Sequence, residues 1–147
     1  MIVLPGSIGF GALTKVVVGA DAGNVTILSG NTVIVDLAPV DLALNDILIV
    51  TWGGRFVKGV TAGDTGLQLV NGGGSASFRF TNSSGVAEWM FVAEPANTQR
   101  KAYATMVGRC IAAGTFVCRL QGTSAGSNTA VTAGELSMLA FVLRGSN

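Results

Sequence analysis

Histidine, the residue most often used as a general base or metal ligand, is absent from this chain. Its absence excludes every Ser-His-Asp and Cys-His arrangement for nucleophilic catalysis. Serines such as Ser7, Ser29 and Ser124 lie in glycine-rich segments, where small hydroxyl residues are typical turn formers. We therefore expect these serines to shape turns and not to attack substrates.

The two cysteines, Cys110 and Cys118, are the next candidates for chemistry. Because side chains alternate along a strand, both thiols are expected to face inward, opposite Arg109 and Arg119. A hairpin with a three-residue loop at 113–115 would pair the two cysteines, whereas a two-residue loop would offset them by one position. Two buried free thiols are the favoured interpretation and a disulfide is the alternative. Two thiols are too few for a structural zinc site.

The carboxylates could pair for acid-base chemistry, as Asp41 with Asp46 or as Glu88 with Glu94. Asp41 and Asp46 flank a bend before an apolar run, which favours a role in the turn and in solubility. The glycine run at 72–74 lacks the Lys-Ser/Thr ending of a phosphate loop. We therefore predict that the protein is not an enzyme and that it binds no cofactor and no metal.

Three aromatic residues, Trp52, Trp89 and Tyr103, could stack on a sugar ring. They are scattered along the sequence, and Trp52 ends an apolar run while Trp89 falls within a predicted strand. Packing in the core or at an interface is therefore favoured over sugar binding.

Turn-forming residues divide the chain into short apolar and β-branched runs. Glycine accounts for 21 of 147 residues, and turn signals recur at roughly 8 to 12 residues, which is typical of a sandwich or barrel. No stretch shows the 3.6-residue period of an amphipathic helix, and residues 95–103 are interpreted as a long crossing loop. The predicted strands are 14–18, 24–28, 32–37, 46–52, 55–60, 66–70, 75–81, 86–93, 102–111, 115–121, 129–132 and 136–143.

We predict a single domain over residues 14–147, because a chain of this length can close a core without disulfides or metals. Residues 1–13 are apolar and glycine-rich, and they form either an arm laid on a neighbour or an ordinary first strand. They lack the basic region of a signal peptide, so we expect synthesis in the cytoplasm without secretion.

The composition is short of charge: 12% of residues are charged and 49% are hydrophobic, against roughly 25% charged in a typical soluble domain. Such a surface exposes apolar patches, which usually mark binding sites. A membrane is not expected as the partner, because the uncharged stretches are broken by glycine and serine and fall short of the ~18 apolar residues of a spanning helix. Nucleic acid is not expected, because the net charge is +1 and the basic residues form no run.

Two predicted strands, at 47–50 and 136–143, are apolar on both faces. A second sheet would cover one face, and another copy of the chain is the favoured cover for the other. The alternative is that both strands lie at the centre of a closed barrel. The residues predicted to form a subunit interface are Ile47, Ile49, Leu136, Met138, Leu139, Phe141 and Leu143.

The last third of the chain, residues 102–145, runs as strand, short Ala-Gly-Thr turn, strand, Gly/Ser/Thr loop, short strand and apolar final strand. This pattern resembles the closing strands of trimeric jelly-roll modules, namely the C1q/TNF-like heads and the related domains of tailed-bacteriophage decoration and fibre proteins. The resemblance implies an all-β, antiparallel, jelly-roll-like β-sandwich with essentially no helix. It also implies that the last strand lies in the middle of the inner sheet and helps to bury a trimer axis.

The resemblance further implies a structural virion protein, a capsid decoration (cement) protein that forms a homotrimer and stabilises the shell. Its expected partners are its own copies and the major capsid protein or another virion protein, and its expected location is the virion. The alternative is a receptor- or glycan-binding head of a tail fibre or adhesin. A small enzyme with carboxylate chemistry is a third hypothesis.

Overall fold

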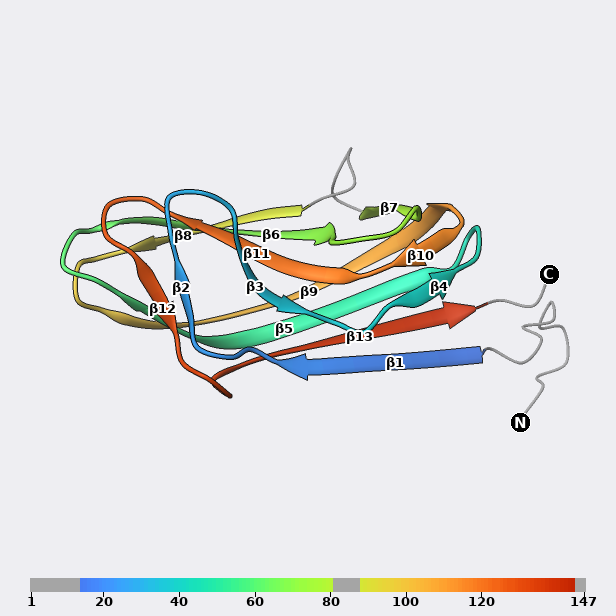
Figure 1. The fold of residues 1–147 in the computed structure, drawn as a ribbon, viewed down its shortest axis with the longest axis horizontal. Coiled ribbons are helices and arrows are strands. Elements are labelled where there is room, and N and C mark those ends of the chain that lie inside the picture. Colours follow the sequence, from blue (N-terminus) through green and yellow to red (C-terminus); the bar gives the residue numbers. More distant parts are fainter. Residues whose placement is uncertain (1–13, 81–87, 145–147) are drawn as a thin grey trace, which may run out of the picture.

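The computed structural model describes residues 14–80 and 88–144, which form strands and turns and no helix (Figure 1). The predicted all-β class is therefore confirmed, whereas the predicted arm or strand at 1–13 lies outside the described residues. The strands are β1 (Thr14–Asp21), β2 (Val25–Ile27), β3 (Thr32–Asp36), β4 (Val40–Leu42), β5 (Ile47–Lys58), β6 (Gly63–Asn71), β7 (Ser77–Phe80), β8 (Glu88–Glu94), β9 (Gln99–Ala112), β10 (Gly114–Phe116), β11 (Cys118–Ser124), β12 (Thr129–Val131) and β13 (Leu136–Arg144).

Two antiparallel sheets pack face to face as a sandwich (Figure 1). The first, here called the β5 sheet, has the order β1-β13-β5-β9, and β7 lies beside β9. Strand β12 pairs with the last residues of β5, next to the end of β13, and β2 pairs with β12. The second, the β11 sheet, has the order β3-β11-β6-β8, and β4 pairs with β10. Within the described residues, eight strands have five or more residues, and we number them one to eight along the chain. Their order is one, eight, three, six in the β5 sheet and two, seven, four, five in the β11 sheet. This order is that of a jelly roll.

The core lies between the sheets and follows the two-residue period of the strands. Along β5 every second residue is buried, including Leu48, Val50, Trp52 and Phe56. Two pairs of aromatic rings meet edge to face in this core. Trp52 and Phe56 have ring centroids 6.4 Å apart, and Phe78 and Phe116 have centroids 4.8 Å apart.

Several predicted boundaries were wrong because sheet pairing overrides local turn signals. Gly53 and Gly54, expected to separate two strands, lie inside the single strand β5, whose ladders with β13 and β9 both continue across them. Strand β9 begins at Gln99, so the crossing between sheets takes only residues 95–98. The predicted strand 115–121 is divided into β10 and β11, which pair with different partners.

The predicted hairpin between the cysteines is also wrong. Cys110 lies in β9 of the β5 sheet, whereas Cys118 lies in β11 of the opposite sheet. Both thiols are free and buried, which confirms the favoured interpretation over a disulfide. Burial raises the pKa of both; for Cys118, burial and the nearby Asp36 carboxylate raise the pKa to about 12. Neither thiol is therefore activated as a nucleophile.

Candidate binding face

The outer face of the β5 sheet carries the exposed side chains that the core does not use. Strand register sets these side chains in rows across the sheet. One row runs from Val17 through Phe141 and Ile49 to Val107. The next row toward the end of β13 joins Leu143, Ile47 and Arg109, and the row on the other side joins Leu139, Thr51 and Thr105.

The predicted interface residues divide between the two faces of this sheet. Leu136 is fully buried and Met138 is 1% exposed, so both belong to the core of the single chain and are not available to a neighbouring subunit. The physical reason is the two-residue period, which turns alternate positions of β13 toward opposite faces. Ile47, Ile49, Phe141 and Leu143 are half-buried on the outer face, and Leu139 is exposed there. A subunit interface remains a prediction for these five.

One end of the outer face is apolar across four strands. Val17 on β1 is 46% exposed, Leu139 on β13 is 41% exposed, and Val107 on β9 is 39% exposed. We call this region the apolar patch; its residues are Val17, Ile47, Ile49, Val107, Leu139, Phe141 and Leu143. An apolar surface that extends over neighbouring strands is typical of a protein-binding face.

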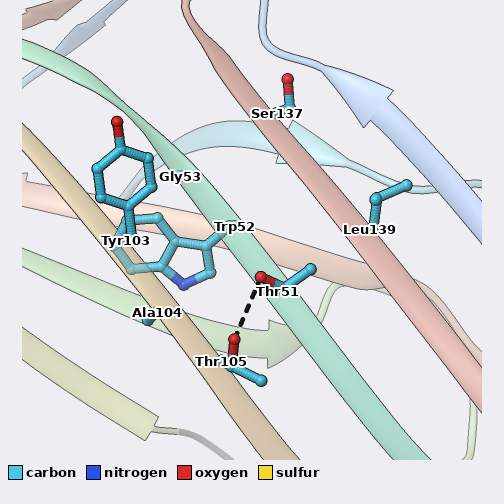
Figure 2. Close-up of a pocket in the computed structure, with 8 residues that line it drawn as sticks. All are labelled: Thr51, Trp52, Gly53, Tyr103, Ala104, Thr105, Ser137 and Leu139. Carbon is cyan, nitrogen blue, oxygen red and sulfur yellow. Dashed lines mark hydrogen bonds between the residues drawn. The ribbon is translucent and has the colours of Figure 1, made fainter.

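Beside the apolar patch the same face is hollowed around Tyr103, and Leu139 belongs to both regions. A depression of about 410 Å³ is lined there by Thr51, Gly53, Tyr103, Thr105, Ser137 and Leu139, among others (Figure 2). A second depression of about 370 Å³ is lined by Gly53, Gly54, Arg55, Lys101, Tyr103 and Glu135. Of the three aromatic residues considered for sugar binding, Trp52 is buried, and the side chain of Trp89 is outside what the structure describes. Tyr103 is 69% exposed.

The carboxylates of Asp41 and Asp46 are each engaged by other groups, and Arg144 contacts both residues, through the carboxylate of Asp46 and the backbone carbonyl of Asp41. Asp46 is buried, and its carboxylate accepts hydrogen bonds from the Ala43 amide at 2.8 Å and from Arg144 Nε at 3.2 Å. Asp41 accepts one from Thr115 Oγ1 at 3.1 Å. The side chains of Glu88 and Glu94 lie outside the described part. Within the described ranges, no group of three or more Cys, Asp or Glu residues could hold a metal ion.

Sequence reasoning missed a buried lysine. The Lys58 side chain is 1% exposed, and its ammonium donates to Ser124 Oγ at 2.7 Å, to the Ala125 carbonyl at 2.5 Å and to Thr129 Oγ1 at 3.5 Å. No carboxylate among the described side chains forms an ion pair with it. The Ser124 hydroxyl also donates to the Ser127 carbonyl at 2.8 Å. Lys58 therefore ties the end of β5 to the loop between β11 and β12.

The comparisons with known proteins assign no family to the chain, so the chain is described by its jelly-roll fold. No protein-family model matches the sequence, and no curated protein matches it significantly. Over residues 14–80 and 88–144 there is no helix long and apolar enough to cross a membrane.

Proposed function

We propose that this chain is a structural protein of a virus particle, a capsid decoration protein of a tailed bacteriophage that assembles as a homotrimer. Its copies would bind one another and the major capsid protein, and they would stabilise the shell by adding buried area across its joints. The virion assignment rests on the resemblance of residues 102–145 to trimeric jelly-roll modules.

The apolar patch is the observation that carries the proposal. Three of its members, Val17, Leu139 and Val107, are each about two-fifths exposed although they are apolar. Burial of apolar surface stabilises by roughly 25 cal/mol per Å² removed from water, so a covering partner gains free energy at each position. The low charge content of the chain favours protein as that partner.

A second copy is the favoured cover because of where the patch lies. Strand β13 is an interior strand of its sheet, between the edge strand β1 and the central strand β5, and the resemblance implies an interior position for the strand nearest a trimer axis. A closed cyclic assembly covers the same patch on every copy and leaves no open apolar surface at its ends. The homotrimer therefore accounts for both the apolar residues and their position in the sheet.

The virion role is tested on particles of the virus that encodes the chain. We expect purified particles to contain the protein in many copies, and its gene to lie beside capsid genes. Particles made without it should release their DNA at a lower temperature in a fluorescent-dye release assay, because the shell joints lose buried area. Particles that lack the protein, or that are equally stable without it, would contradict the proposal.

A further inference from the structure

Tyr103 is the most exposed aromatic side chain among those the structure describes, at 69% exposure. It lies on the outer face of β9, and its cross-strand neighbour on β5 is Gly53. The other described rings are half-buried or buried. A ring this exposed contributes little to the stability of the core, so core packing does not explain why an aromatic residue stands at position 103.

The Tyr103 ring packs directly on the backbone of Gly53. A Cβ atom at position 53 would lie 2.7 Å from Tyr103 Cε1 and 3.3 Å from Cγ, so a side chain could stand there only if the Tyr103 ring moved away. In Figure 2 the ring lies beside Gly53, with Ser137 and Leu139 of β13 across β5 from it. Glycine at this position thus lets the ring pack against the sheet and leaves a large part of its surface open.

Tyr103 and Gly53 line both depressions on this end of the face, of about 410 Å³ and 370 Å³. The two hollows therefore adjoin at the ring, and together they extend across β13, β5 and β9. We call the pair the Tyr103 groove. The absence of a side chain at Gly53 is what opens it, since every other outward position of β5 carries a side chain.

Ordered hydrogen-bonding groups stand at one end of the Tyr103 groove. Arg55 binds Glu135 through two hydrogen bonds, Nε to Oε2 at 2.7 Å and Nη2 to Oε1 at 2.5 Å. Its Nη1 donates to Gln99 Oε1 at 2.9 Å. These three side chains hold one another in place, so their remaining donors and acceptors are presented in a fixed geometry.

The charge near the ring is positive. Glu135 neutralises Arg55, whereas Lys101, two residues before Tyr103 on the same face of β9, forms no ion pair with a described side chain. The carboxylate of Asp21 accepts a hydrogen bond at 2.7 Å from Ser137, which lines the first depression, so it stands at the β13 side of the groove. Lys101 lines the second depression together with Tyr103, and it is the charge on the β9 side of the groove that no described side chain pairs with.

We propose that the Tyr103 groove binds an acidic saccharide, a site that goes beyond the proposed shell role. The C–H face of a pyranose stacks on the electron-rich face of an aromatic ring, while hydroxyl groups at the edge of the sugar bond to side chains that line the groove, such as Arg55 and Glu135. Lys101 pairs with a carboxylate or sulfate on the sugar. The hydroxyl groups of Thr51, Thr105 and Ser137 and the charged groups of Arg55 and Lys101 supply hydrogen-bonding partners along the groove, which favours a saccharide over a protein partner. The apolar patch, the surface expected for a protein partner, adjoins the groove at Leu139.

The test is an NMR titration of the full chain with acidic fragments of polygalacturonate, hyaluronate and chondroitin sulfate, and with uncharged maltotetraose. We expect at least one acidic fragment to shift the backbone amides of Gly53, Gly54 and Tyr103, and maltotetraose to bind at least tenfold more weakly. Tyr103→Ala should weaken the acidic fragment at least tenfold. Lys101→Gln should reduce the preference for it over maltotetraose to less than about threefold.

Ile111→Ala, on the same face of β9 but outside both the Tyr103 groove and the apolar patch, is the matched control and should leave binding unchanged. The proposal is overturned if none of the three acidic fragments shifts these amides, if maltotetraose binds as well, or if Tyr103→Ala binds as well as the wild type. The oligomeric mass of each variant separates this site from the shell role. A Tyr103→Ala protein that dissociates into monomers would place the ring in the subunit interface and also overturn the saccharide site.

Discussion

Cys118 makes the stability of this fold sensitive to alkaline pH in a way that can be calculated. Its thiol is 1% exposed, and burial together with the charge of Asp36 raises its pKa from 9.0 to about 12. In the unfolded chain the same thiol ionises near its ordinary pKa, so the folded state holds a proton that the unfolded state has lost. The stabilisation from this proton is fully present below pH 9 and falls as the pH rises from 9 toward 12.

The expected loss is about 1 kcal/mol of unfolding free energy between pH 8 and pH 10, since each pH unit within the window corresponds to about 1 kcal/mol. Urea unfolding of the wild type and of Cys118→Ala at both pH values, under reducing conditions, measures it. The other ionisable groups are present in both proteins, so their contributions cancel when the two unfolding free energies are subtracted. The Cys118→Ala variant is less stable at pH 8, and this deficit should shrink by about 1 kcal/mol at pH 10. A deficit that stays constant with pH would refute the reasoning.

Two further predictions concern the core and the buried lysine. Leu48→Ala should lower the unfolding free energy by about 2 to 5 kcal/mol, because Leu48 is fully buried. Ile49→Ala, one residue away on the outer face, should cost clearly less in the isolated chain, and equal costs in urea unfolding would contradict the assignment of faces. Ser124→Ala removes an acceptor of the Lys58 ammonium and should lower the unfolding free energy by about 1 to 3 kcal/mol. The control Thr123→Ala changes a half-buried side chain and should lower it by less than about 1 kcal/mol. If the urea midpoint of Ser124→Ala equals that of the wild type, the hydrogen bond between Ser124 and Lys58 does not stabilise the fold.

The fold class could be predicted from the sequence because it depends on local patterns. Turn residues at short intervals and two-residue alternation exclude helices without any knowledge of which strands pair. The faces of β13 follow from the same alternation. Residues 136 and 138 point opposite to 139, 141 and 143, so Leu136 and Met138 could have been separated from the outward residues on parity alone.

Features that depend on pairing could not be predicted. Gly53 and Gly54 have the local signature of a turn, and only the flanking strands β13 and β9 keep them extended. Because two separate strands were predicted here, the alternation could not be followed from Trp52 to Lys58. In the single strand β5, Lys58 points inward like Trp52 and Phe56. The Tyr103 groove was hidden for the same reason, since Gly53 lies opposite Tyr103 only in the observed register.

Local alternation also cannot tell which sheet a strand joins. Cys110 and Cys118 face inward as expected, and the residues between them suit a hairpin as well as a crossing. The crossing occurs because β9 pairs with β5 and β7, while β11 pairs with β3 and β6. These are long-range contacts that short segments do not encode.

The central claim, that the apolar patch is covered by copies of the same chain, is tested most directly by sedimentation equilibrium at micromolar concentration. We expect the wild type to sediment with a mass three times 14.9 kDa. Leu139→Asp should reduce it to that of the monomer, because a carboxylate would be buried in the interface. Val33→Asp, which changes a similarly exposed residue of β3 in the opposite sheet, should leave the trimer intact. A wild-type protein that sediments at 14.9 kDa would contradict the claim.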